Sequence, residues 1–193
     1  MKRFFIYSVM TLQLLACSSV QLVKTEINLQ PTANEIAKIL AVTNWHLLGR
    51  LSVRNTEESW LTKIEWRHAS LADEVTLSTS LGGVVAKLSY MDNIITISKA
   101  GEHERVVSER EMESLIGYSP PLPHLKYWLR GVPNPAVGAQ INNESPVSTR
   151  VFVQDGWRVN LERFMVFNER VLPTKMSFTK DGLKMKLVVD EWL

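Results

Sequence analysis

The sequence predicts a mainly β fold with a few helices, in which about ten or eleven antiparallel strands form either one strongly curved sheet or an unclosed antiparallel β-barrel, capped on one face by helices. Three observations predict this fold. Apolar and polar residues alternate along most segments after residue 44. Turn-forming pairs separate several of these segments, and capping signals open a few short helical stretches. A chain of 193 residues with 45% hydrophobic residues is long enough to bury the core of one such domain.

The first expected element is a helix over about residues 33–43. Thr32 and Glu35 have the spacing of a capping box, in which each side chain satisfies a backbone N–H of the other. Ile36, Ile39 and Leu40 follow at helical spacing.

The period then changes to two, which is typical of half-buried antiparallel strands. Strands are expected over 45–54 and 59–67, because the apolar side chains in each share one face. These side chains are Trp45, Leu47, Leu51 and Val53 in the first segment, joined by Gly49, and Trp60, Thr62, Ile64 and Trp66 in the second. The same pattern predicts further strands over 74–79, 84–91 and 94–98, the last two joined by Asp92-Asn93.

Another group of strands is expected near the C-terminus, over 151–154, 157–164, 175–179 and 183–192. Asp155-Gly156 and Asp181-Gly182 each separate two of these runs, and Asp-Gly is a strong hairpin signal because both turn residues need a positive φ.

Two short helices are expected between the two groups of strands. One begins at the Ser108 and Glu111 capping box and ends at Gly117, and the other covers about 122–130 and ends at Gly131. Residues 132–149 are predicted to be a long irregular loop.

The first residues have the pattern of a secretory signal peptide. Met1-Lys2-Arg3 is positively charged, and a mostly apolar run, Phe4–Leu15, follows it. This run is too short to span a bilayer as a helix. The alternative interpretation is a buried N-terminal helix or a membrane anchor. Leu14-Leu15-Ala16-Cys17 resembles the lipobox of bacterial lipoproteins, which implies a lipid on Cys17. We therefore expect a signal peptide at 1–16, a lipidated tether at 17–31 and a folded domain at 32–193. In bacterial lipoproteins, an Asp directly after the modified Cys commonly signals retention in the inner membrane. Ser18 occupies that position here, so the resemblance implies the outer membrane.

Composition excludes several classes of function. The formal net charge of +2, from 22 basic and 20 acidic residues, argues against a protein that binds nucleic acid. A single cysteine rules out an intramolecular disulfide and argues against a cysteine metal site. The histidines show no metal-ligand spacing, and the sequence contains neither a Gly-x-Ser-x-Gly nucleophile motif nor a phosphate-binding glycine loop. We predict no enzyme, no metal and no cofactor.

Six tryptophans lie mostly on the apolar strand faces. They fit an ordinary packed core, and they fit equally a cavity for an apolar ligand, since a curved sheet of this size can enclose one. Strand parity gives the expected cavity residues, although a one-residue slip would exchange the faces. They are Trp45, Leu47, Leu51, Val53, Trp60, Ile64, Trp66, Leu77 and Leu88, with Trp128 in the helical lid.

Several motifs together resemble the LolB family of outer-membrane lipoprotein receptors, in order and along nearly the whole chain. They are the lipobox at Cys17, Trp45-x-x-x-Gly49-Arg50-Leu51, Trp66, Ser80-Leu81-Gly82, Ile116-Gly117, Leu125-x-x-Trp128-Leu129-x-Gly131-x-Pro133, Gly156-Trp157-x-Val159 and Leu187-x-x-x-x-Trp192. The resemblance implies an unclosed barrel with a helical lid over a hydrophobic cavity.

The resemblance also implies a function at the periplasmic face of the outer membrane of a Gram-negative bacterium. A monomer would accept acylated lipoproteins from the periplasmic carrier LolA and insert them among outer-membrane phospholipids, without nucleotide hydrolysis. In the family a leucine on a protruding loop serves membrane targeting, and Leu81 matches it. Ser80 stands where the resemblance leads us to expect proline. Alternatively, Leu81 folds over its own turn.

Two other classes of function stay open on the sequence. One is a lipoprotein of similar fold that binds another apolar ligand or scaffolds an envelope complex. The other is an envelope hydrolase, which would need a carboxylate or histidine with a strongly shifted pKa in a cleft.

Overall fold

The computed structural model describes residues 31–116, 120–142, 146 and 148–193. The expected signal peptide, Cys17 and almost the whole tether lie outside the described residues, as does Gly117. In the described part, no helix has the length and apolar character needed to cross a membrane.

Three helices and eleven strands make up the described chain. Their bounds are α1 Ala33–Leu40, β1 Asn44–Arg54, β2 Ser59–Ala69, β3 Ala72–Ser78, β4 Val84–Met91, β5 Ile94–Lys99, β6 Arg105–Val107, α2 Glu109–Ile116, α3 Leu122–Trp128, β7 Ala139–Asn142, β8 Thr149–Gln154, β9 Trp157–Phe167, β10 Arg170–Lys180 and β11 Leu183–Trp192.

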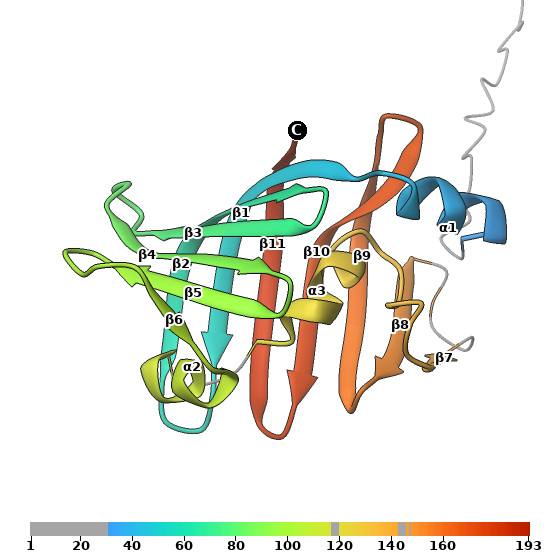
Figure 1. The fold of residues 1–193 in the computed structure, drawn as a ribbon. Coiled ribbons are helices and arrows are strands. Elements are labelled where there is room, and N and C mark those ends of the chain that lie inside the picture. Colours follow the sequence, from blue (N-terminus) through green and yellow to red (C-terminus); the bar gives the residue numbers. More distant parts are fainter. Residues whose placement is uncertain (1–30, 117–119, 143–145, 147) are drawn as a thin grey trace, which may run out of the picture.

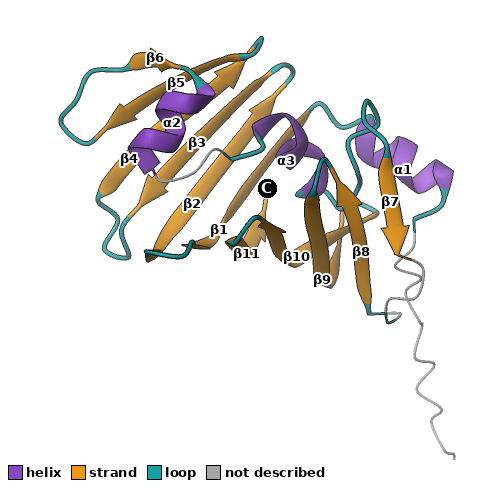
Figure 2. Ribbon diagram, turned by 90° about the horizontal axis from the view of Figure 1, so that it is seen from below, coloured by secondary structure: helices purple, strands orange, loops and turns teal. Residues whose placement is uncertain are grey.

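All these strands form one antiparallel sheet in the order β6-β5-β4-β3-β2-β1-β11-β10-β9-β8-β7. The outermost strands, β6 and β7, are not paired with each other, so the sheet is curved but unclosed (Figure 1). The helices α2 and α3 lie over the same side of the sheet, whereas α1 lies beside its other end (Figure 2). The expected mainly β, unclosed architecture is confirmed.

The link between the two halves of the sheet is the pairing of β1 with the last strand, β11, and it depends on a glycine. The register shifts between Leu48 and Gly49. A Cβ atom at Gly49 would lie 2.4 Å from the carbonyl oxygen of Val188 on β11, closer than any side chain allows. Gly49 is therefore required by the close approach of the two backbones.

The predicted hairpin turns are present, with both central residues in the left-handed region. This holds for Asp92-Asn93, Asp155-Gly156 and Asp181-Gly182. The sequence analysis missed a similar turn at Asn168-Glu169, where φ is 47° and 63°. It joins β9 to β10, so both strands extend further than the expected 157–164 and 175–179.

The capping boxes are also present. The Thr32 side chain accepts from the Glu35 N–H at 3.3 Å, while the Glu35 carboxylate accepts from the Thr32 N–H at 2.7 Å. Ser108 and Glu111 make the equivalent pair at 3.2 and 2.8 Å. The first helix ends at Leu40, so it is shorter than the expected 33–43.

Two short strands were not predicted. Residues 132–149 are not a continuous loop, because they contain β7, which pairs with β8. Strand β6, Arg105–Val107, lies in a segment for which no strand was predicted, and it pairs with β5. Each strand has four residues or fewer, which is too short to show an alternation of apolar side chains.

Two aromatic groups occupy the core, one on each side of the centre of the sheet. Trp45 contacts Trp66, His68 and Trp192, with ring centroids 5.2 to 6.0 Å apart. Trp128 on α3 forms the other group. It contacts His124, Phe152, Trp157 and Phe178 at 5.2 to 6.3 Å. Both groups belong to one continuous apolar cluster.

Candidate functional site

The ten residues predicted to line a cavity lie together in this apolar cluster, but to different depths. Six of them are buried: Trp45, Leu47, Val53, Ile64, Trp66 and Trp128. The other four are half-buried and pack against its border: Leu51, Trp60, Leu77 and Leu88. The aromatic groups therefore form the deep part of the cluster, and Trp60 and Leu77 on this border reach a pocket.

A large pocket opens at that border and has a volume of about 950 Å³, within the range of ligand sites. It forms because β2 pairs with β1 along its whole length, but with β3 only from Lys63 onward. The first residues of β2, Ser59–Thr62, consequently have no strand on their other side. Side chains from both faces of the sheet reach this opening. They are Arg50, Asn55, Glu57, Glu58, Trp60, Leu61, Thr62, Lys63, Leu77, Thr79, Ser80, Val85, Ala86 and Lys99.

A second pocket, of about 620 Å³, adjoins the first and shares Asn55 and Glu57 with it. It lies between the N-terminal end of α3 and the β8–β9 and β10–β11 turns. Its apolar floor includes Trp157 and Leu183. Four carboxylates line it: Glu57, Glu113, Asp155 and Asp181. This second pocket is thus acidic.

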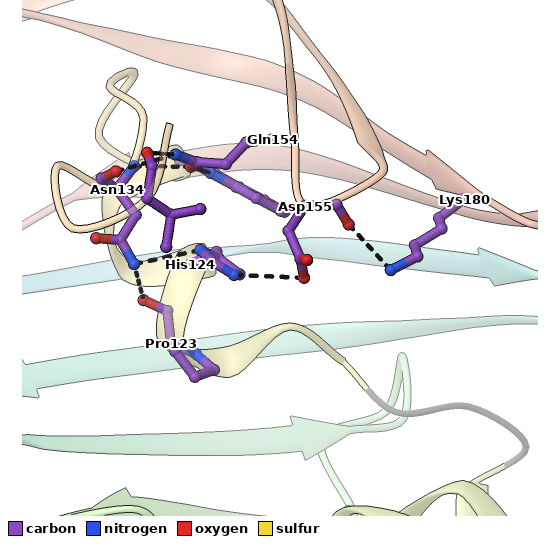
Figure 3. A network of polar contacts seen from close by, with 8 residues as sticks. Pro123, His124, Asn134, Gln154, Asp155 and Lys180 are labelled. Carbon is purple, nitrogen blue, oxygen red and sulfur yellow. Dashed lines mark hydrogen bonds and ion pairs between the residues drawn. The ribbon is translucent and has the colours of Figure 1, made fainter. Parts of the chain in front are cut away.

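A buried hydrogen-bond network fixes α3 on the sheet (Figure 3). The side-chain oxygen of Gln154 accepts from the indole N–H of Trp128 at 2.8 Å and from the backbone N–H of Asn134 at 2.9 Å. Its side-chain nitrogen donates to the carbonyls of Asn134 and Val137 at 2.9 and 2.6 Å. Every hydrogen-bonding atom of this amide is satisfied, although the side chain is only 1% exposed.

The same network reaches the acidic pocket. The side-chain nitrogen of Asn134 lies 3.2 Å from Nδ1 of the His124 ring. Nε2 of the same ring lies 3.6 Å from the Asp155 carboxylate. Lys180 donates to the backbone carbonyl of Asp155 at 2.9 Å. These contacts hold the N-terminal part of α3 against the β8–β9 turn (Figure 3).

Leu81 belongs to the loop between β3 and β4, and this loop is at the left of Figure 1. Gly82 donates to the carbonyl of Thr79 at 3.0 Å, and Thr79 donates to the carbonyl of Gly83 at 2.8 Å. With Gly82 at φ 93°, this is a tight three-residue loop. The Leu81 side chain is 97% exposed, so it does not cover its own turn. Its neighbour Ser80 lines the large pocket.

Arg130 is a buried group that the sequence analysis did not identify. It follows α3 and donates to the carbonyls of Ile39 and Val42 at 2.8 and 3.0 Å. Its guanidinium also packs over the rings of Trp45 and Tyr127. Burial lowers the pKa of Arg130. This residue connects α1 to α3, an arrangement that no local sequence pattern reveals.

A buried His68–Asp73 pair was also missed. Asp73 accepts from the indole of Trp66 and lies next to the His68 ring, both at 2.8 Å. It lies in the closed part of the core rather than in a pocket. Among the residues that the structure describes, no group of three potential metal ligands occurs.

Comparison with known proteins identifies the family. The family model for outer membrane lipoprotein LolB matches residues 43–192. An outer-membrane lipoprotein LolB of Azoarcus sp. (strain BH72) is 26% identical over 181 residues, which cover 92% of this chain and 93% of the relative. The Nitrosomonas europaea protein of the same description is 28% identical over 151 residues, 76% of this chain and 71% of the relative.

Two solved structures show the same fold. A LolA superfamily protein of Nitrosomonas europaea has a TM-score of 0.50 at 10% identity and covers 84% of this chain and 93% of its own. A putative outer-membrane lipoprotein-sorting protein domain of Vibrio parahaemolyticus has a TM-score of 0.52 at 7% identity, covering 83% and 89%. With the family match over most of the sequence, these findings show that the chain belongs to the LolB family of outer-membrane lipoproteins.

Proposed function

We propose that the protein accepts acylated lipoproteins from the periplasmic carrier LolA into its apolar interior and inserts them into the outer membrane. The observation that carries the proposal is the pocket of about 950 Å³ beside Trp60 and Leu77. It borders the apolar cluster on one side and the exposed Leu81 loop on the other. This arrangement gives acyl chains a path from an apolar interior to a site that can touch a bilayer.

The energetics of the cargo require such a protected path. Three acyl chains contain about 45 methylene groups, so exposing them to water costs at most about 35 kcal/mol. Free diffusion across the periplasm is therefore far too slow. A handover between two apolar cavities avoids this cost, and it needs only a higher affinity in the receiving protein, without nucleotide hydrolysis.

The proposed anchor lies outside the described residues. Cleavage of the signal peptide at 1–16 would leave a lipid on Cys17 and a tether over 17–31. A flexible chain of fifteen residues spans about 20 Å and reaches at most about 50 Å. The domain at 32–193 would therefore work close to its membrane, as a monomer in contact with phospholipid.

A transfer assay tests the proposal. The chain from residue 17 onward, carrying Cys17→Ala so that no lipid of its own holds it, is mixed with LolA loaded with a labelled lipoprotein. We expect the label to move to this protein without nucleotide. Label that stays on a carrier known to be competent for transfer to another acceptor would contradict the proposal. It would favour instead the binding of another apolar ligand or a scaffold role.

A further inference from the structure

The outer face of the sheet carries a row of exposed cations across its centre. The register places Arg158 on β9 opposite Thr179, Thr179 opposite Lys184 on β11, and Lys184 opposite Arg54 on β1. One row further along, Lys186 lies between Ser177 and Ser52. All four cations are exposed, whereas the residues that alternate with them are buried or half-buried on the core side. We call Arg54, Arg158, Lys184 and Lys186 the basic face.

Carboxylates do not neutralise the basic face. None of its four side chains has a carboxylate within 4.0 Å among the described residues. Nearby outward carboxylates are already paired: Asp190 with Arg50 at 2.7 Å and Glu162 with Lys175 at 2.5 Å. The acids of the adjoining turns line the two pockets instead: Glu57 and Glu58 line the large pocket, and Glu57, Asp155 and Asp181 line the second one. Positive charge therefore gathers on the outer face of the sheet, and negative charge gathers at the second pocket.

The basic face continues toward the exposed apolar loop. In its second row, Ser52 is opposite Leu61, whose side chain is 72% exposed although it lies in a strand. Leu61 lines the large pocket together with Lys63 and with Ser80, the neighbour of Leu81. A surface that combines exposed cations with exposed leucines matches the chemistry of an anionic bilayer, in which headgroups attract the cations and apolar tips enter the acyl boundary.

We propose that the basic face docks the protein on anionic phospholipid headgroups. Docking of this face brings Leu61 and the Leu81 loop to the bilayer and turns the large pocket toward it. The acidic second pocket then lies away from the phosphate groups, which would repel it. The proposal deepens the proposed function, on which it rests for the membrane it names, because it gives the orientation in which cargo leaves the protein.

Vesicle binding tests the proposal directly. The chain from residue 17 onward with Cys17→Ala is sedimented with vesicles of phosphatidylethanolamine and phosphatidylglycerol, and with vesicles of phosphatidylcholine alone. The test variant carries R54Q, K184Q and K186Q. The control variant carries K38Q, R105Q and R110Q, three exposed cations on α1, β6 and α2, so both lose the same charge. Thermal unfolding of each variant verifies that it is folded.

We expect the test variant to bind the anionic vesicles roughly a hundredfold more weakly, since each basic residue near such a surface contributes several-fold to binding. The control variant should bind like the parent chain, and the parent should bind more weakly as salt screens the headgroups. Equal losses in the two variants, or equal binding of the parent to phosphatidylcholine, would overturn the proposal. So would a test variant that binds vesicles normally but no longer takes cargo from LolA, because the face would then dock a protein.

This experiment is independent of the transfer assay. If the parent chain binds anionic vesicles through the basic face but takes no lipoprotein from LolA, then the proposed function fails and the docking surface stands. If transfer occurs but vesicle binding ignores the basic face, then the docking proposal alone fails.

Discussion

The indole nitrogen of Trp128 donates a 2.8 Å hydrogen bond to the side-chain oxygen of Gln154, and neither side chain is more than 1% exposed. Trp128 is the last residue of α3, and Gln154 is the last residue of β8. The bond therefore joins the helix that covers the sheet to a strand of the sheet itself. Because Gln154 also holds Asn134 and Val137, the same side chain fixes the loop that follows the helix.

Replacing Gln154 by leucine should destabilise the protein by about 2–4 kcal/mol, since it leaves several buried polar groups without partners. Urea unfolding followed by tryptophan fluorescence measures this change. Gln140→Leu is the matched control, because Gln140 is exposed on β7 and its replacement should alter stability by less than about 0.5 kcal/mol. A similar stability for the two variants would show that the network contributes little.

Leu81→Glu should leave the acceptance of lipoprotein from LolA intact but slow the incorporation of the lipoprotein into membranes roughly tenfold. The reason is that a carboxylate at the end of the loop does not enter the boundary between the lipid headgroups and the acyl chains. The measurement separates lipoprotein bound to the soluble variant from lipoprotein in vesicles over time. Leu71→Glu provides the control. Leu71 is a 71% exposed leucine in the turn at the opposite end of β3. Unchanged incorporation by Leu81→Glu, or equal slowing by both variants, would argue against a specific role of the Leu81 loop.

Acyl chains in the large pocket should quench the fluorescence of Trp60 when they carry bromine. Trp60 lines this pocket, whereas Trp192 lies in the closed aromatic group, 4% exposed and 5.9 Å from Trp45. Titration with a brominated fatty acid should therefore quench the parent and Trp192→Phe, and Trp60→Phe should lose most of the effect. Quenching that survives in Trp60→Phe would place the chains elsewhere.

Acid should weaken α1 and α2 through their capping boxes. Hydrogen bonds from Thr32 lower the pKa of Glu35, and hydrogen bonds from Ser108 lower that of Glu111, relative to the ordinary value of 4.5. A carboxylate with a lowered pKa stabilises the folded state above the unfolded pKa, and this contribution disappears as pH falls through the folded pKa.

The double variant Glu35→Gln and Glu111→Gln should therefore differ from the parent in its free energy of unfolding at neutral pH and approach it near pH 3. Urea unfolding across that pH range measures the difference. Glu102→Gln alters an exposed carboxylate outside both boxes, so its difference from the parent should not follow the same course. A difference between double variant and parent that stays constant with pH would contradict this account.

Local signals were sufficient to predict most of the fold. Alternation over eight residues or more predicts β1 and β2, and the Asp-Gly pairs predict their turns, because both depend only on neighbouring residues. The end of β9 was missed for a local reason. Arg163 has φ 51°, and Pro173 on the facing strand cannot donate to the ladder. Together they interrupt the alternation before the Asn168-Glu169 turn.

The site was less predictable, because it depends on contacts between distant segments. Strand parity brings Trp60 and Leu77 to one pocket, but the pocket itself results from the start of β2, which pairs with β1 and not with β3, and only the register reveals this. Gln154 and Arg130 gave no sequence signal for the same reason. Their partners, Trp128 and Ile39, lie 26 and 91 residues away along the chain.

The free edges of the sheet have a mechanical consequence. A closed barrel has a circumference fixed by its strand number and shear, so widening it means breaking a ladder of hydrogen bonds. Here β6 and β7 are unjoined, and small changes of twist between neighbouring strands can move these two edges apart with every ladder intact. The interior can therefore widen around a bulky ligand and narrow again after its release, through elastic bending of the sheet and without a hinge.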